Sequence, residues 1–236
     1  MKVRVKFAKY GTLRFIGHLD VMRFFQKALR RAGVDVAYTT GFSPHQVMSF
    51  ASPLGLGIDS FGEYMDIEVN SHQGAADMAR RINEACVPGI EVINVRALPD
   101  TAGNAMASIA AARYTVRYKE GEADFYWLEG LLASFLAQER IQVVKETKKG
   151  TAQVDIRPGI YECFVQKDGS LEFLVDASSA GNIKPALLLG ALWRFAGKEE
   201  EAPLLKWQLT RKELYTNRGT PERAGFVPLD EVGEEF

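Results

Sequence analysis

The stretch KVRVKFAK at residues 2–9 alternates basic and apolar side chains, and LDVMRFFQKALRRAG at residues 19–33 repeats apolar side chains with a helical period. The first pattern predicts a half-buried strand, because successive side chains of a strand point to opposite faces. In the second, apolar side chains fill one arc of a helix that ends at Gly33, and basic side chains fill much of the opposite arc. Together they predict a helix that packs on a sheet with its basic side outward.

The segments after this helix complete a β-α-β-β-α-β order, which the second half of the chain repeats imperfectly. In the first half we expect extended segments at 34–40 and 62–69, a helix at 73–85 and a strand at 90–97. In the second half we expect strands at 113–119, 141–146, 160–166, 170–177 and 204–215, and helices at 124–136 and 182–195. Lys167-Asp168-Gly169 predicts a hairpin turn, and residues 152–157 add one strand to the repeat.

This order predicts an α+β protein made of two tandem ferredoxin-like halves, each an antiparallel sheet with helices on one face. The first half spans residues 1–98 and carries the basic helix, His18 and His45. Residues 99–112 are rich in small side chains and are predicted to be a linker. The second half spans 113–216, and residues 217–236 are predicted to be a loosely attached acidic tail.

The composition excludes several classes of protein. A chain of 236 residues that is 47% hydrophobic and 25% charged is typical of a soluble globular protein. It has neither a membrane-spanning apolar run nor the apolar core of a signal peptide at its N-terminus, so we expect the cytoplasm. The two cysteines, Cys86 and Cys163, are isolated, which argues against a zinc site or an iron-sulfur cluster in this chain.

The net charge of -1 conceals a polarised distribution. Residues 1–50 hold nine basic and two acidic residues, whereas residues 51–100 hold three basic and eight acidic residues. A chain of this kind can present a concentrated positive face, which attracts polyanions. The candidate polyanion contacts lie on the helix, on the outer sides of the first strand of each half, and before the helix: Arg23, Lys27, Arg30, Arg31, Lys2, Arg4, Lys6, Arg113, Arg117 and Arg14.

These basic residues have a second interpretation, since most charged helix faces are simply solvated. The helix carries no acid between its bases after Asp20, whereas solubilising faces generally mix signs. The basic strand faces would form a positive cleft only if the open faces of both sheets look into it.

Two histidines lie in unusual segments, RFIGHLD at residues 14–20 and GFSPH at residues 41–45. Imidazole titrates near neutral pH, so His18 and His45 could donate to phosphate or act as acid and base, with Asp20 as a third candidate. The alternatives are histidines packed at loop junctions, and an Asp20 that caps the helix or pairs with Arg23 or Arg14.

The glycine-rich loop at residues 50–62 is either a recognition loop or a plain connection. The chain has no GxSxG, HExxH or Walker loop motif.

The segments RFIGHLDVMRFFQKALRRAG (14–33) and GFSPHQVMSFASPLGLGIDSFGEYMDIEV (41–69) resemble the signature of the radical SAM-linked protein family, a bacterial domain of unknown function. Residues 148–158 resemble a later family motif more loosely. The resemblance implies partnership with a radical SAM enzyme that carries S-adenosylmethionine and an iron-sulfur cluster, while this chain binds no cofactor. The family often has Pro-His-Pro where this chain has Pro44-His45-Gln46, which leaves the loop after His45 undefined.

From these observations we predict that the chain is an accessory RNA-binding protein that presents a structured RNA, such as tRNA or rRNA, to the radical SAM enzyme. We expect it to bind neither DNA nor a membrane. One alternative is a subunit that docks on that enzyme without nucleic acid. Another is a metal-independent endoribonuclease-like or small-anion enzyme that uses His18 and His45. That alternative follows from a similarity in architecture and charge to the duplicated ferredoxin-like endoribonucleases that process CRISPR repeats.

Overall fold

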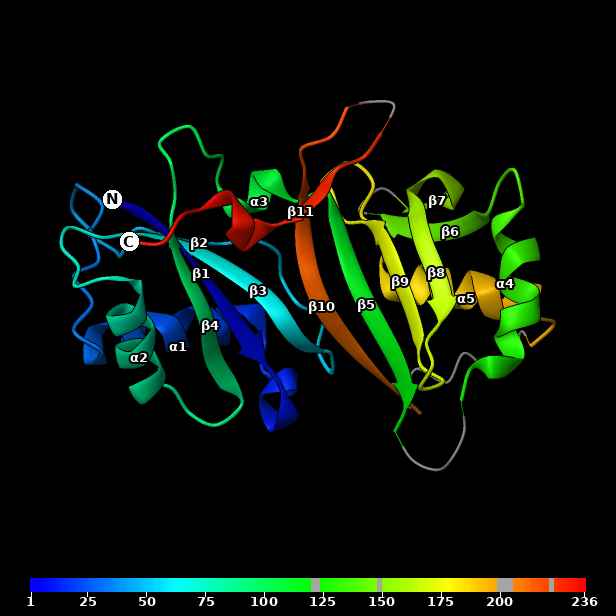
Figure 1. Ribbon diagram of the computed structural model, residues 1–236, viewed down its shortest axis with the longest axis horizontal. Coiled ribbons are helices and arrows are strands. Elements are labelled where there is room, and N and C mark those ends of the chain that lie inside the picture. The colour runs from blue at the N-terminus through cyan, green and yellow to red at the C-terminus, as the bar shows by residue number, and fades with distance from the viewer. Residues whose placement is uncertain (120–123, 148–149, 199–205, 221–222) are drawn as a thin grey trace. The chain divides into compact units, whose positions relative to one another are not determined.

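The computed structural model describes residues 1–119, 124–147, 150–198, 206–220 and 223–236, and Figure 1 shows their arrangement. The chain forms two compact units, one of Met1–Ala110 with Arg211–Phe236 and one of Ala111–Thr210. The α+β class is confirmed, since five α-helices in the described part of the chain accompany strands whose pairings are mostly antiparallel. No described helix has the length and apolar character needed to cross a membrane.

Unit 1 is built on a sheet in which β1 lies between β3 and β4, antiparallel to both. The short β2 pairs with β3, and residues 211–217 of β10 lie on the same side of β1 as β3 does. The elements of this unit are β1 (Lys2–Lys9), η1 (Gly11–Phe15), α1 (His18–Arg31), β2 (Met48–Phe50), β3 (Asp59–Glu68), α2 (Ala75–Glu84), β4 (Ile90–Ala97), α3 (Ala105–Ser108), β11 (Phe226–Pro228), η4 (Leu229–Val232) and the end of β10 (Trp207–Asn217).

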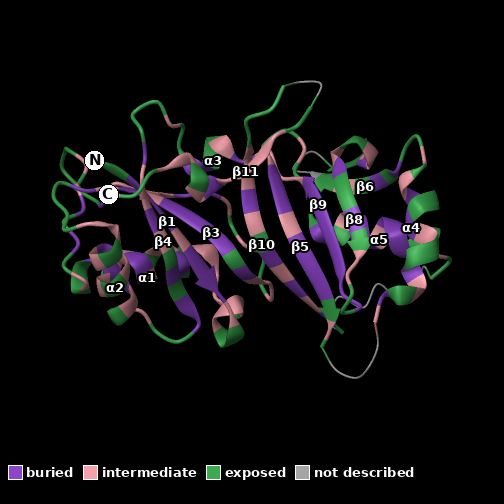
Figure 2. Cartoon of the chain, viewed as in Figure 1, coloured by how far each residue is buried: buried purple, intermediate pink, exposed green. Residues whose placement is uncertain are grey.

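The core of unit 1 lies between the sheet and the helices α1 and α2. Val3, Val5 and Phe7 of β1 belong to it, as their alternation predicts, and they are almost completely buried. Figure 2 shows β1 coloured mostly as buried. Phe25 of α1 stacks edge-on against Phe7 with ring centroids 4.6 Å apart, and Ile82 of α2 joins the same cluster. The predicted apolar arc of the basic helix therefore packs on the sheet as expected.

The opposite face of this sheet is covered, which corrects the expectation of an open basic face. Arg4 is completely buried, and its guanidinium donates to the carbonyl oxygens of Gly103 and Leu229. Leu229 is itself completely buried. The described part of the segment predicted to be a loosely attached tail therefore packs on unit 1, because Leu229 is buried there and Asp230 pairs with Lys6.

The predicted linker also has a structure. The Asn104 side chain accepts a hydrogen bond from the amide of Ala107 and caps the short helix α3, and Ala105 is completely buried. The small side chains of this segment conceal such a short helix in the sequence.

The extended segment predicted at 34–40 forms only isolated bridges, at Val36 and Tyr38.

Unit 2 has a sheet in which β9 lies between β5 and β8, antiparallel to both, and β6 and β7 form a separate hairpin. The extra predicted strand therefore belongs to its own two-stranded sheet. The elements of this unit are β5 (Ala111–Tyr118), η2 (Tyr126–Leu128), α4 (Glu129–Leu136), β6 (Gln142–Thr147), β7 (Gly150–Asp155), η3 (Arg157–Gly159), β8 (Ile160–Val165), β9 (Leu171–Asp176), α5 (Pro185–Phe195) and the start of β10.

Aromatic side chains dominate the core of unit 2. The ring centroids of Trp193 and Trp207 lie 4.4 Å apart, and Phe125 packs on both rings. The predicted turn at residues 167–169 connects β8 to β9, and Gly169 adopts the positive φ of 75° that this turn requires. Lys148 and Lys149, which open the loosely matched motif, lie outside the described residues.

Candidate functional site

The outward face of α1 carries the four predicted basic side chains, all exposed. Arg23 has a side chain that is 71% exposed and lies 3.6 Å from Asp20, a weak surface pair. Among the described residues, no carboxylate pairs with Lys27, Arg30 or Arg31. Arg30 and Arg31 donate instead to the carbonyl oxygens of Gln26 and Ala85, which leaves their positive charge uncompensated.

Asp20 takes one of its two predicted structural roles. The N-cap of α1 is Gly17, and no side chain caps the helix. Asp20 lies in the first turn, where its charge is favourable to the helix dipole, and pairs with Arg23.

The strand bases are placed differently from the helix bases. Arg4 makes two hydrogen bonds to Asp66, of 2.8 and 3.0 Å. Burial lowers the pKa of Lys6, but contacts with Glu213 at 2.5 Å and Asp230 at 3.5 Å outweigh it, so the pKa is raised overall. Both cations are neutralised inside unit 1, and Arg4 cannot reach an external ligand.

The corresponding bases of unit 2 are also paired. Arg113 lies 2.8 Å from both Glu162 and Glu172, and Arg117 lies 2.5 Å from Asp168. Lys2, at the start of β1, is exposed. Apart from Lys2, the predicted strand bases are therefore held in ion pairs, whereas α1 keeps a face of exposed bases.

Lys9 shapes the turn that precedes α1. Its side chain is buried, and its ammonium donates to the carbonyl oxygens of Ile16 at 3.1 Å and Arg14 at 3.5 Å. Burial lowers the pKa of Lys9, although the charges of Glu63 and Asp59 oppose this shift. Lys9 thus fixes the backbone of the RFIGHLD segment from the protein interior.

His18 lies beside a small cavity of about 10 Å³ that Lys9, Ser52 and Glu63 also line. Its ring packs edge-on against Phe50, with centroids 5.5 Å apart. The cavity has room for about one water molecule. It is too small for a substrate, so this geometry favours a packed histidine over a catalytic one.

His45 is exposed and belongs to a local turn. Its Nδ1 lies 3.1 Å from the hydroxyl of Thr39 and 3.3 Å from the carbonyl oxygen of Ser43. No hydrogen bond or ring contact in the described part of the chain joins His45 to His18. The two imidazoles therefore make no direct contact, and their roles as acid and base stay a prediction.

The glycine-rich loop at residues 50–62 is held against the turn before α1. The amide of Gly57 donates to the carbonyl oxygen of Arg14 at 3.0 Å, and the guanidinium of Arg211 donates to the carbonyl oxygen of Ser52 at 3.2 Å. Asp59 accepts from the amide of Gly11 and pairs with Arg14 at 3.3 Å. These contacts place the loop and the turn on one surface.

Sequence reasoning missed two exposed aromatic side chains on this surface. Phe15 ends η1 and is 62% exposed, and Phe61 lies on β3 and is 42% exposed. The guanidinium of Arg14 lies 5.1 Å from the Phe15 ring centroid, and the ammonium of Lys212 lies 5.8 Å from that of Phe61. In the sequence, Phe15 and Phe61 are not distinguished from the other phenylalanines of residues 14–33 and 41–69.

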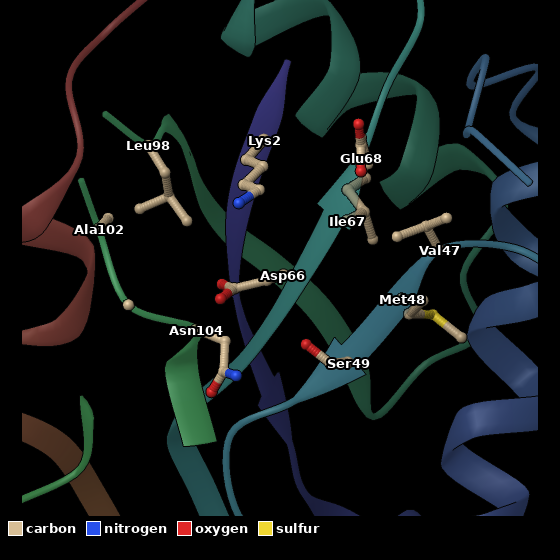
Figure 3. A pocket seen from close by; sticks show the side chains of 11 residues that line it. Lys2, Val47, Met48, Ser49, Asp66, Ile67, Glu68, Leu98, Ala102 and Asn104 are labelled. Atoms are coloured by element: carbon tan, nitrogen blue, oxygen red, sulfur yellow. The ribbon is translucent and has the colours of Figure 1, made fainter. Parts of the chain in front are cut away.

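A second hollow of about 180 Å³ lies in unit 1 beside β2 and β3 (Figure 3). The Asp66 carboxylate, which lines this hollow, accepts hydrogen bonds from Arg4 and from the amide of Ala105 at 2.7 Å. The Asp66 carboxylate is therefore already satisfied by the fold and needs no ligand to neutralise it. The described residues also contain no group of three or more His, Cys, Asp or Glu side chains that could hold a metal ion.

The fold and site define an α+β protein with an uncompensated basic helix face. The family model described as "Uncharacterized protein conserved in bacteria (DUF2344)" matches residues 2–185, and the chain belongs to this family. The match contains η1, α1 and the glycine-rich loop. A search of curated proteins found no match.

Proposed function

We propose that this chain is an accessory RNA-binding protein whose α1 face contacts the phosphates of a structured RNA, such as tRNA or rRNA. The observation that carries the proposal is the contrast between two sets of bases. Arg4, Lys6 and Arg113 are neutralised by carboxylates, whereas Lys27 and Arg30 on α1 are exposed without a carboxylate partner among the described residues.

The arrangement on α1 costs stability in the free protein. Arg23 and Lys27 are four residues apart, as are Lys27 and Arg31, and like charges at this spacing destabilise a helix by about 0.2–0.5 kcal/mol per pair. Binding to phosphates would relieve this repulsion and release counterions from the RNA. A face kept only for solubility would mix acids with the bases.

The proposed partner is a radical SAM enzyme, which would carry the S-adenosylmethionine and the iron-sulfur cluster. This part of the proposal rests on the resemblance of residues 14–33 and 41–69 to the radical SAM-linked family. The ferredoxin-like architecture of each unit is likewise proposed, because the order β4-β1-β3 of unit 1 is compatible with it.

The experiment compares the affinity of three proteins for unfractionated tRNA at one moderate salt concentration. The Arg23→Glu/Arg30→Glu variant is expected to lose binding, since two phosphate contacts become repulsive. The control, Lys184→Glu/Arg194→Glu, makes the same change in net charge at two exposed residues of unit 2 and is expected to bind like the wild type.

Equal affinity in the wild type and the α1 variant would contradict the proposal. Native mass spectrometry with the radical SAM enzyme after nuclease treatment tests the alternative. A stable RNA-free complex, together with no RNA affinity in either protein, would replace RNA binding with protein docking.

A further inference from the structure

We infer that the surface formed by Phe15, Phe61 and their neighbouring cations binds unpaired bases, so that the RNA bound at α1 has a single-stranded segment next to the helix face. This inference rests on the proposed function and specifies the class of RNA. Its basis is the exposure of two large aromatic rings beside a basic helix.

Exposing an aromatic ring to water is unfavourable, and here the fold holds both rings in exposed positions. Phe61 stacks on Tyr10 with ring centroids 5.8 Å apart and an interplanar angle of 20°, which fixes its orientation. Phe15 follows Arg14, whose carbonyl oxygen accepts from both the buried Lys9 ammonium and the Gly57 amide. Both rings are therefore presented on a rigid base instead of on a flexible loop.

The rings belong to one surface through a chain of contacts. Asp59 pairs with Arg14, and Arg14 lies over the Phe15 ring. Phe61 is two residues after Asp59 on β3, so both side chains are on the same face of that strand. The Asp59 carboxylate thereby joins the turn that carries Phe15 to the strand that carries Phe61.

The turn that carries Phe15 leads within three residues into α1, which begins at His18. Leu19 is 65% exposed in the first turn, and Arg23 and Lys27 follow it at intervals of four residues. Residues four apart lie on the same side of a helix. A strand of RNA that crosses from Phe15 to Lys27 would meet aromatic rings first and cations afterwards.

The chemistry of this surface matches a nucleotide with an unpaired base. Every base has a π-face that can stack on an exposed aromatic ring, and a duplex withholds that face. Lys212, an exposed residue whose ammonium lies over the Phe61 ring, would supply a positive charge for the phosphate of a nucleotide bound there. Stacking on rings with adjacent cations is typical of proteins that bind single strands with little sequence preference.

The test measures the affinity of the full chain for a mixed-sequence single-stranded RNA oligonucleotide and for the same strand annealed to its complement. The wild type should bind the single strand more tightly. Phe15→Ala and Phe61→Ala should each weaken single-strand binding at least about fivefold and leave duplex binding and the salt dependence unchanged. Phe164→Ala, which removes a ring 41% exposed in unit 2, is the matched control and should bind like the wild type.

The outcomes separate this inference from the proposed function. If both phenylalanine variants bind the single strand like the wild type, and the α1 charge variant does not bind, the stacking surface is refuted and RNA binding stands. If neither RNA binds the wild type, both proposals fail. If the phenylalanine variants keep their RNA affinity but lose a complex with the radical SAM enzyme, the surface is a protein-docking site and the inference is wrong.

Discussion

Replacing Arg211 tests how much its buried ion pair with Glu63 stabilises the protein. Arg211 is 3% exposed and its partner Glu63 is 7% exposed, and two hydrogen bonds of 2.8 and 2.6 Å join them. In Arg211→Met the Glu63 carboxylate stays buried without its main partner, which costs about 3–5 kcal/mol in comparable buried pairs. The positive charge of Lys9 also attracts the Glu63 carboxylate, so we expect the loss of stability in Arg211→Met to lie near the lower end of this range, at about 3 kcal/mol.

The loss is measured by urea denaturation and by thermal melting. For a chain of this size each kcal/mol lowers the melting temperature by roughly 2–4 °C, so we expect a decrease of about 6–12 °C. The control Lys212→Met changes the exposed neighbouring residue and should stay within about 0.5 kcal/mol of the wild type.

The double variant Arg211→Met/Glu63→Leu removes both charges and should recover most of the lost stability, because neither charge is then left buried and unpaired. A loss below about 1 kcal/mol in Arg211→Met alone would refute the reasoning, since it would mean that Glu63 is well hydrated without Arg211.

Two further predictions concern the packing of the fold. Burial alone would raise the pKa of Asp230, but Lys6 and two hydrogen-bonding side chains hold it below its ordinary value. Asp230→Asn should therefore cost stability at pH 7, and urea denaturation should show the difference disappearing as the pH falls below about 4; a difference that grows in acid would contradict this. A Cβ at Gly62 would lie 2.6 Å from the Cα of Glu213, so Gly62→Ala should cost about 1–3 kcal/mol in thermal melting. Gly130→Ala, at an open position on α4, should instead be neutral or stabilise by up to about 1 kcal/mol, and equal effects of the two would refute the close approach.

The local elements of this fold could be predicted from the sequence. The alternation at residues 2–9 identified β1 over the same residues, and the apolar arc at residues 19–33 identified α1 within two residues at each end. These patterns are strong because each depends on neighbours along the chain that share one buried face.

The burial and ion pairing of the strand bases could not be predicted in this way. Arg4 pairs with Asp66, 62 residues away, and Lys6 pairs with Glu213, 207 residues away. Alternation shows that these bases share a face, but it does not show which acids fold over that face. For the same reason the acidic composition of residues 217–236 suggested a loose tail, whereas Asp230 and Leu229 pack on the sheet.

The site could be predicted in part. The basic side of α1 followed directly from its helical period, and the structure leaves it exposed as expected. The exposed rings of Phe15 and Phe61 were missed because apolar residues are assigned to the core by default. Only the positions of the turn and of β3 show that these rings face outward.

The most direct test of RNA binding by α1 is a salt titration of the affinity for unfractionated tRNA. If the four exposed bases of α1 each neutralise one phosphate, the slope of log affinity against log salt concentration should be about -3, which weakens binding about 60-fold between 50 and 200 mM salt. Arg23→Gln/Arg30→Gln should reduce the slope to about -1.5 and the weakening to about eightfold. An unchanged slope in this variant, or a wild-type slope near zero, would contradict RNA binding by the basic face of α1.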